Sequence, residues 1–313
     1  MRFSFWISAS HPWEEILAQA RHAEATGWDG VYVADHFMPN DDAALDQPMQ
    51  ECFSVLAGLA AAVPRLRLGS LVAAATYRHP AVLAKQAATI DQISGGRLVL
   101  GVGAGWQVNE HERYGIELGS VRDRIDRFEE ACQVWRGLRD DDRTTIEGEH
   151  YRLTDAPLVP KPTGPLPLLI GSSGQQRMAR IVARYADEWN TWSTPTLWRT
   201  KREGYERALD EIGRDPSSLH RSTQALVLLG ADGRAKAEEL AAIRPAIGGT
   251  SEQLVEAIGD WAEQGLDELI VPGFTLGAGA QTADALDQLI TEVAPAFGGA
   301  GARDGGHGHG VDR

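Results

Sequence analysis

The chain has 313 residues, of which 43% are hydrophobic and 24% are charged, so it can form a large core and does not have the composition of a disordered protein. Acidic residues outnumber basic residues by 44 to 30, and the net charge is −14. This charge, without a basic stripe, argues against binding of nucleic acid, because a phosphate backbone would be repelled.

Short apolar segments alternate with amphipathic helical segments along the chain. The eight predicted strands span residues 3–7, 30–34, 66–72, 97–102, 168–170, 188–191, 223–229 and 268–271. The predicted helices span residues 13–26, 51–63, 80–93, 121–138, 175–185, 197–212, 233–243, 251–264 and 282–297. Gly27 suits the end of the first helix, and Pro80 suits the first turn of the third. Strands and helices in this order are typical of a parallel sheet.

Two segments depart from this alternation. Residues 144–153 alternate in polarity around Gly148, which predicts a β-hairpin inserted before the fifth strand. Residues 298–313 are rich in glycine and histidine and are predicted to form a disordered tail beyond a single domain of residues 1–297.

The eight units favour a closed (β/α)₈ TIM barrel over an open, doubly wound sheet. An open dinucleotide-binding sheet would carry a Gly-x-Gly-x-x-Gly turn directly after the first strand, and this chain does not. The glycines at positions 101, 103 and 105 follow the fourth strand instead.

We expect a cytoplasmic protein that does not enter a membrane. The first ten residues are too short and too polar for a signal peptide, and no apolar run approaches the roughly 20 residues of a membrane span. Cys52 and Cys132 lie in apolar helical contexts, which indicates two buried, reduced thiols.

In a (β/α)₈ barrel the functional groups lie on the loops that follow the strands. His36 follows the second strand and could act as a general acid or base, with Asp35 orienting a neighbour. The alternative is that both residues only order the loop. After the third strand, the small residues of segment 69–76 would let a flat ring approach the backbone, or would serve close packing.

The fourth and fifth strands end in glycine-rich loops. Gly103, Ala104 and Gly105 precede Trp106, which could form a wall for a planar ligand or pack in the core. Glu110 and His111 are interpreted as ordinary loop residues. The sequence of residues 171–175, Gly171, Ser172, Ser173, Gly174 and Gln175, opens a helix, so its amides and hydroxyls could bind an anion or simply cap the helix.

Two indoles, Trp189 and Trp192, are predicted to lie near the same rim and to favour a flat, apolar ligand. The sequence contains no convincing set of metal ligands, no Gly-x-Ser-x-Gly nucleophile turn and no phosphate loop ending in Gly-Lys-Ser/Thr. We therefore expect a bound cofactor to carry the chemistry.

Three segments together resemble the luciferase-like monooxygenase superfamily of flavoproteins and deazaflavin enzymes. They are HAEATGWDGVYVADHF, TYRHPAVLAKQAATIDQISGGRLVLGVGAGWQVNE and PLLIGSSGQQRMARIVARYADEWN. Within this superfamily the chain is most similar to the branch that uses coenzyme F420, although members that use FMN share most of these motifs.

The resemblance implies a role for each matching position. Asp35 and His36 would lie close to the deazaflavin ring, and a cis peptide bond between Leu71 and Val72, or alternatively between Ser70 and Leu71, would pack behind it. The remaining cofactor contacts implied by the resemblance are Gly103, Ala104, Gly105 and Trp106 beside the ring, Asn109 as a polar contact, and Ser172, Ser173, Gly174 and Gln175 at the phosphate. Many deazaflavin dehydrogenases carry a glutamate where Trp106 stands, which argues against a sugar phosphate as the substrate.

The leading hypothesis is an F420-dependent oxidoreductase that transfers a hydride between reduced deazaflavin and a small organic substrate held between His36 and Trp106. The first alternative is an FMN-dependent monooxygenase with the same fold. A protein that binds deazaflavin without turnover and a metal-dependent hydrolase are the others. A homodimer is one expectation for the assembly, and the substrate is left unnamed.

Overall fold

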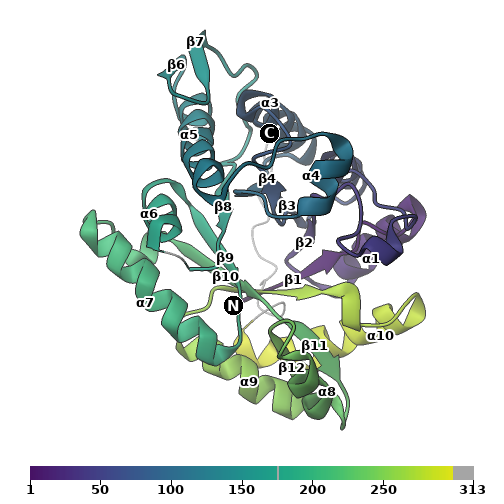
Figure 1. Ribbon diagram of the computed structural model, residues 1–313. Helices are drawn as coiled ribbons and strands as arrows, with labels where there is room; N and C mark the ends of the chain where they lie inside the picture. Colours follow the sequence, from purple (N-terminus) through teal and green to yellow (C-terminus); the bar gives the residue numbers. More distant parts are fainter. Residues whose placement is uncertain (175, 299–313) are drawn as a thin grey trace, which may run out of the picture.

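The computed structural model describes residues 1–174 and 176–298, and its centre is a closed barrel of parallel strands (Figure 1). The ring order is β1, β2, β3, β5, β8, β9, β10 and β13, and the pairing of β1 with β13 and of β3 with β5 closes it. The strands of the barrel are β1 (Arg2–Ile7), β2 (Gly30–Val33), β3 (Arg67–Ser70) with its continuation β4 (Ala73–Ala74), β5 (Leu98–Gly103), β8 (Leu168–Gly171), β9 (Glu188–Trp192), β10 (His220–Gln224) and β13 (Glu268–Pro272). The predicted (β/α)₈ barrel is confirmed.

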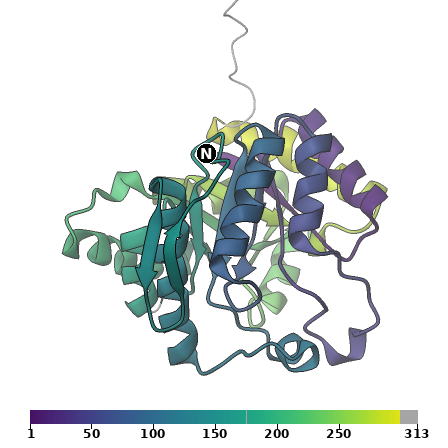
Figure 2. The ribbon, with the colours of Figure 1, turned by 90° about the horizontal axis from the view of Figure 1, so that it is seen from above.

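Helices surround the barrel and cover the outer face of its strands (Figures 1 and 2). They are α1 (Trp13–Thr26), α2 (Cys52–Ala62), α3 (Pro80–Ser94), α5 (Val121–Asp140), α6 (Gln176–Tyr185), α7 (Pro195–Glu211), α9 (Ser251–Glu263) and α10 (Ala280–Gln288). Gly27 ends α1 with a left-handed φ of 98°, and Pro80 begins α3, as their sequence signals indicate. Among the described residues, no helix is long and apolar enough to cross a membrane.

The predicted β-hairpin insertion is also confirmed. The prediction of two buried, unpaired cysteines, Cys52 and Cys132, is confirmed as well. Strands β6 (Thr144–Glu147) and β7 (Arg152–Ala156) pair in antiparallel fashion, so the hairpin extends slightly beyond the predicted limits. The helix predicted over residues 282–297 is α10 followed by a π-helical turn (Leu289–Val293) and a 3₁₀ turn (Ala294–Phe297). The predicted tail lies outside the described residues, apart from Gly298.

The structure differs from the predicted elements in two places, the segment after β10 and the loop after β5. The predicted strand 223–229 is two strands, because β11 (Leu226–Leu229) leaves the barrel and pairs with β12 (Ala246–Gly249) across helix α8 (Gly233–Leu240). In addition, the loop after β5 contains a short helix, α4 (Val108–Tyr114). The β11–β12 pair and helix α4 both lie beyond the carboxyl ends of barrel strands, where functional groups gather.

The opposite end of the barrel is closed by a buried network of charged side chains. Three charged residues each begin a barrel strand at this end: Arg67 in β3, Glu188 in β9 and Glu268 in β13. Nη2 of Arg67 lies 2.6 Å from Oε1 of Glu188, and Nη1 lies 3.0 Å from Oε2 of Glu268. Burial alone would raise the pKa of Glu268, but Arg67 and His220 outweigh it and lower this pKa to about 2. This end is therefore filled by ion pairs, which leaves the other end for ligands.

Candidate active site

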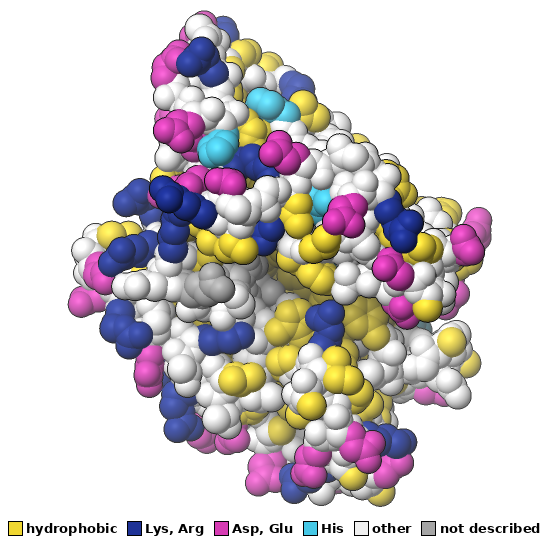
Figure 3. Space-filling view, viewed as in Figure 1, with side chains coloured by type: hydrophobic (Ala, Val, Ile, Leu, Met, Phe, Trp, Pro, Cys, Tyr) yellow, Lys and Arg dark blue, Asp and Glu magenta, His cyan; other side chains and the backbone are white. Residues whose placement is uncertain are grey.

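The carboxyl ends of the strands form the mouth of the barrel, which faces the viewer in Figure 1. Figure 3 shows that the surface is hollowed at the centre of this face and that hydrophobic side chains gather in the hollow. The loops after β2, β5 and β8, which carry most of the predicted site residues, all reach this mouth.

His36 and Glu110 form a hydrogen-bonded pair at the mouth. Nδ1 of His36 lies 2.8 Å from Oε1 of Glu110, and the Glu110 side chain is fully buried. The His36 ring is partly exposed, and the ring of Trp106 meets it at an angle of 82° with 5.7 Å between centroids. His36, Trp106 and the helix α4 residue Glu110 are therefore brought together from two different loops.

The surroundings of Glu110 keep it ionised. It accepts hydrogen bonds from the backbone N–H of Phe37, at 2.9 Å, and from the hydroxyl of Tyr77. Burial alone would raise the pKa of Glu110, but the hydrogen bond and charge of His36, together with these donors, lower it below its ordinary value. Burial and the neighbouring Glu110 carboxylate raise the pKa of Tyr77, so its hydroxyl keeps its proton.

This carboxylate decides how His36 carries its protons. An ionised carboxylate only accepts hydrogen bonds, so Nδ1 of His36 must donate to Glu110. In the neutral imidazole the lone pair then resides on Nε2, which can accept a proton, whereas the imidazolium can donate one from the same atom. The pair thus has the arrangement that general acid–base chemistry requires.

Asp35 lies beside this pair, but its carboxylate is engaged elsewhere. Arg78 donates to both of its oxygens, at 2.7 and 3.0 Å, and the backbone N–H of Ala74 donates at 3.2 Å. The side chain is only 1% exposed, and this burial raises its pKa in spite of Arg78. Its contacts fix the loop after β2 against β4.

The bulge after β3 has the predicted form. A cis peptide bond joins Leu71 and Val72, which confirms this position over the alternative one residue earlier. The buried Ser70 hydroxyl donates to the carbonyl oxygen of Gly101 at 2.7 Å, so Ser70 belongs to the barrel wall. Val72 covers two glycines, since a Cβ on Gly103 would lie 2.9 Å, and one on Gly171 3.0 Å, from its methyl groups.

The loop after β5 presents Trp106 and anchors a neighbouring loop. Gly105 adopts a left-handed φ of 84°, and Trp106 is 53% exposed, so it is a surface of the mouth rather than part of the core. The side-chain N–H of Asn109 donates to the carbonyl oxygen of Pro39 and to Asp42, each at 3.2 Å. Asn109 therefore fixes the position of the loop after β2. Ala104, in the same loop as Trp106, is partly buried against the main core.

The loop after β8 combines backbone and side-chain donors. Ser172 and Gly174 are partly exposed and Ser173 is exposed, while Gln175 lies outside the described residues. The hydroxyl of Tyr205 lies beside Ser172 and the N–H of Gly174, yet no described residue forms a well-aligned hydrogen bond with it. Burial raises the pKa of Tyr205 to about 12, so it remains a donor.

A lysine that the sequence analysis missed lies against this loop. A Cβ on Gly174 would be 3.3 Å from Cγ of Lys201, which comes from helix α7. Its Nζ donates to the carbonyl oxygen of Trp192 at 2.7 Å and to the Thr191 hydroxyl at 3.0 Å. Both acceptors are neutral, so they do not balance the positive charge of the Lys201 ammonium group. This charge would favour an anion at the loop after β8.

The two predicted rim indoles have different positions. Side chains alternate along a strand, so Trp192 and Trp189 point to opposite faces of β9. Trp192 faces the mouth and contacts Trp6, with 5.8 Å between ring centroids. Trp189 is fully buried outside the barrel, stacked on Trp198 of α7 at 4.9 Å. The prediction that both line the ligand site was wrong for Trp189.

The interpretation of Glu110 and His111 as ordinary loop residues was wrong, because both are buried residues of helix α4. The N-cap Gln107 and the α4 residues Glu110 and His111 are buried and recur at intervals of three and four, which is the signature of an inward helical face. This spacing could have revealed Glu110, but the segment between Gly105 and Gly115 is too short for a confident helix prediction.

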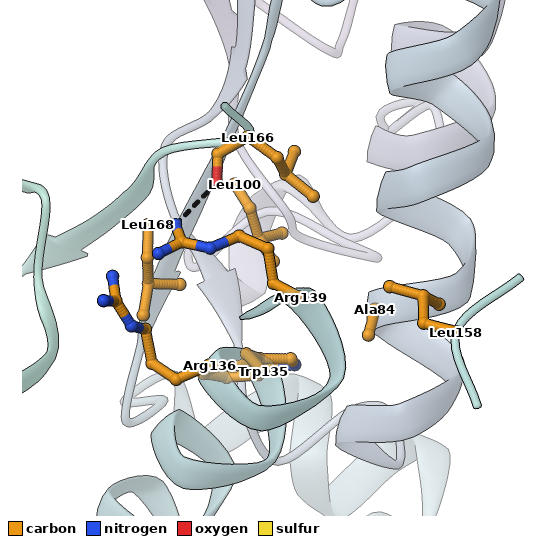
Figure 4. Close-up of a pocket in the computed structure, with 8 residues that line it drawn as sticks. All are labelled: Ala84, Leu100, Trp135, Arg136, Arg139, Leu158, Leu166 and Leu168. Atoms are coloured by element: carbon orange, nitrogen blue, oxygen red, sulfur yellow. Dashed lines mark hydrogen bonds between the residues drawn. The ribbon is translucent and has the colours of Figure 1, made fainter. Parts of the chain in front are cut away.

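Two other features lie away from the mouth. Figure 4 shows a gap between the barrel wall and helices α3 and α5, and its volume of about 10 Å³ leaves room for little more than one water molecule. Glu188, His220 and Glu268 have ligand atoms within 4.8 Å of one another at the closed end of the barrel. Arg67 already neutralises much of this cluster, so its chemistry fits an ion-pair network better than a metal site.

Comparison with known proteins gives one family over nearly the whole chain. The family model described as luciferase-like monooxygenase matches residues 1–303. The F420-dependent glucose-6-phosphate dehydrogenase of Nakamurella multipartita is 34% identical over 224 residues, which cover 68% of this chain and 65% of that protein. The enzyme of the same name from Amycolatopsis mediterranei is 32% identical over 173 residues, 55% of this chain and 50% of that protein. The matched region thus spans half to two thirds of these relatives.

Solved structures share the fold across almost the full length. An F420-dependent secondary alcohol dehydrogenase in complex with an F420–acetone adduct has a TM-score of 0.82 at 22% identity, with 95% of this chain and 98% of that chain covered. The coenzyme F420 dependent tetrahydromethanopterin reductase from Methanopyrus kandleri has a TM-score of 0.79 at 18% identity, with 95% and 99% covered.

Proposed function

The chain belongs to the luciferase-like monooxygenase family, and from this premise we propose that it is an oxidoreductase that uses coenzyme F420 to transfer a hydride to or from a small organic substrate. The observation that carries the proposal is that the His36–Glu110 pair, the bulge between β3 and β4, and the donor-rich loop after β8 surround one barrel mouth. The choice of F420 over FMN is supported by the curated relatives, which are F420-dependent enzymes.

The donors in the loop after β8 fit the anionic part of such a cofactor. Ser172, Ser173 and Gly174 would hold a phosphate, and Lys201 would supply a positive charge. The buried hydroxyl of Tyr205, which lacks a well-aligned partner among the described residues, is suited to donate to the same anion. Gln175, which is not among the described residues, remains a proposed contact from the sequence.

The ring of the cofactor would lie over the bulge at Leu71 and Val72, with Gly103, Ala104, Gly105 and Trp106 along its edge. When bound, coenzyme F420 supplies a deazaflavin ring that gives or takes a hydride. The residues of this chain then position the substrate and move the accompanying proton. Asp35 and Asn109 would support the site by fixing the loop that carries His36.

His36 is the proposed group for this proton. Glu110 accepts a hydrogen bond from Nδ1 and leaves Nε2 to exchange a proton with a substrate hydroxyl or carbonyl oxygen. Trp106 covers the edge of His36 and limits the access of water from that side. Trp106 stands where many deazaflavin dehydrogenases carry a glutamate, so the proposal does not extend to glucose 6-phosphate, the substrate named for the curated relatives.

The proposal is tested by turnover with the isolated protein. We expect a screen of small alcohols, aldehydes and ketones to reveal substrate-dependent reduction or oxidation of F420. Oxygen uptake that depends on reduced FMN would favour the monooxygenase, and tight F420 binding without turnover on any substrate would favour a binding protein. We further propose that the protein acts in the cytoplasm, since its two buried thiols are unpaired. We also propose that it forms homodimers, which a measurement of its mass in solution tests.

A further inference from the structure

Three aromatic side chains, Trp192, Trp6 and Phe274, form a cluster at the mouth, and Trp192 lies opposite His36. In the ring order, β2 and β9 are separated by three strands in either direction, so His36 after β2 and Trp192 at the end of β9 face each other across the barrel. Trp6 of β1 contacts Trp192 and also meets Phe274 edge-on, with 5.0 Å between centroids. Phe274 is 52% exposed and Trp192 is half-buried, so these two rings are open to a ligand, whereas Trp6 is buried.

Arg244 lies on this aromatic cluster. It precedes β12 in the segment that leaves the barrel, and its Cζ is 4.9 Å from the centroid of the Trp192 ring. The ion pairs found among the described residues do not involve Arg244, whereas Arg78 and Arg113 on other loops are paired with carboxylates. In Figure 3, basic side chains lie beside the hydrophobic side chains of the central hollow.

A guanidinium stacked on an indole is oriented for a planar anion. Stacking uses the face of the guanidinium, while its N–H groups point outward in the plane. Two parallel N–H donors match the two oxygens of a carboxylate, which would lie at the edge of Trp192 rather than above it. In a chain with a net charge of −14, such a charge without a carboxylate partner is suited to attract an anionic group.

We propose that Arg244, Trp192, Trp6 and Phe274 form a substrate subsite that takes a carboxylate with an apolar, preferably aromatic, body. The carboxylate pairs with Arg244, the body lies on Trp192 and Phe274 with the buried Trp6 packed against both rings, and the end that reacts faces His36. This assignment rests on the proposed function, because His36 defines the reacting end.

The anionic part of the cofactor has a different place. The loop after β8 has its own donors and its own cation, Lys201, whose stem lies beside Gly174 and whose Nζ donates to the carbonyl oxygen of Trp192. Arg244 approaches Trp192 from the β11–β12 segment and stacks on its ring. The two cations thus serve two anions, one on the cofactor and one on the substrate.

The test measures ligand preference with the F420-loaded protein. The probes are 3-phenylpropanoate and its neutral amide, 3-phenylpropanamide, titrated by calorimetry against the wild type, Arg244→Gln and Arg244→Lys. Arg234→Gln is the matched control, because Arg234 is an exposed arginine of the same segment that only approaches Glu256 at 3.7 Å. The Kd for F420 is measured for every variant.

We expect the wild type and Arg234→Gln to bind the carboxylate about tenfold more tightly than the amide, as a charge-assisted hydrogen bond predicts. Arg244→Gln should lose this preference, and Arg244→Lys should keep part of it. The subsite is wrong if the wild type shows no preference, if Arg244→Gln retains it, or if Arg244→Gln weakens F420 binding instead. If no variant binds F420 but Arg244→Gln still removes the preference, the subsite stands and the proposed function fails.

Discussion

Nδ1 of His36 and Oε1 of Glu110 are 2.8 Å apart although the residues are separated by 74 positions in the chain. This contact joins the loop after β2 to helix α4 and sets the histidine with Nε2 free for a substrate. Because Glu110 is fully buried while the His36 ring is partly exposed, in the proposed function the carboxylate would act on the substrate only through the histidine. Glu110 is therefore a positioning residue.

Glu110→Gln should lower kcat while leaving the Kd for F420 unchanged. The amide can still accept from Nδ1 of His36 through its oxygen, but it has no negative charge and can also donate to the wrong partner. We expect kcat to fall by roughly tenfold or more, and by about a hundredfold in His36→Ala, which removes the acid–base group itself. Steady-state kinetics and F420 titration measure both quantities.

If Glu110 were only structural, Glu110→Gln would change the melting temperature and leave kcat of the folded fraction intact. Glu112→Gln is a suitable control on the same helix, because Glu112 is exposed. Its kcat should match that of the wild type.

Ser173→Ala should weaken cofactor binding without affecting stability. Ser173 is exposed at the loop after β8, so removal of its hydroxyl costs one donor to the phosphate and no packing. A hydrogen bond to a charged group contributes about 1.5 kcal/mol or more, which corresponds to an increase of about tenfold in the Kd for F420. Thr200→Ala, on the exposed face of α7, should leave the Kd unchanged. An unchanged Kd in Ser173→Ala would move the phosphate site elsewhere.

Asp35→Asn should act mainly on stability. The change removes the charge that faces Arg78 in a buried pair, although Glu51 still accepts from Arg78 at 2.6 Å. We expect the free energy of unfolding to fall by about 2–3 kcal/mol, measured by urea denaturation. The exposed Asp46→Asn is the control and should be close to neutral. Unchanged stability with a large loss of turnover would show that Asp35 acts on the reacting molecules instead.

The closed end of the barrel predicts a loss of stability in acid. The pKa of Glu268 is about 2 in the folded protein, against an ordinary value of 4.5. Because the folded pKa is the lower one, the ionised form stabilises the fold above pH 4.5, and this contribution of about 3 kcal/mol is lost as the pH falls toward 2. The pKa of Glu188 is raised by burial, so its protonation in acid would stabilise the fold and mask part of the loss. The contribution of Glu268 is therefore isolated by comparing the wild type with a variant at position 268.

Urea midpoints at pH 7 and pH 3 provide this comparison. The wild type should lose more of its free energy of unfolding between these pH values than Glu268→Gln, which cannot titrate at this position. Equal losses in both proteins would contradict the assignment of the low pKa to Glu268.

The barrel could be predicted from the sequence because its signals are local. Apolar strands, helices that begin at residues such as Pro80 and end at residues such as Gly27, and the hairpin around Gly148 all follow from short-range patterns. β12 was missed because its sequence, AIGG, is short and contains two glycines, which disfavour strands. It forms because it pairs with β11, a contact that no local pattern encodes.

The candidate site shows the same limit. The loops that carry His36, Trp106 and Ser172 were predicted because they follow recognisable strands. Glu110 was interpreted as a loop residue because helix α4 is short, and Lys201 and Arg244 were missed because their elements reach the mouth only through the tertiary fold. Trp189 and Trp192 were grouped together because they are close in sequence, but the alternation along β9 directs them to opposite faces.

The most direct test of the account is a comparison of cofactor affinities. Purified protein is titrated with F420 and, separately, with FMN, and binding is followed by the fluorescence of each cofactor. We expect F420 to bind more tightly than FMN and Ser173→Ala to weaken the binding of F420. Tighter binding of FMN, or binding of neither cofactor, would contradict the proposed function.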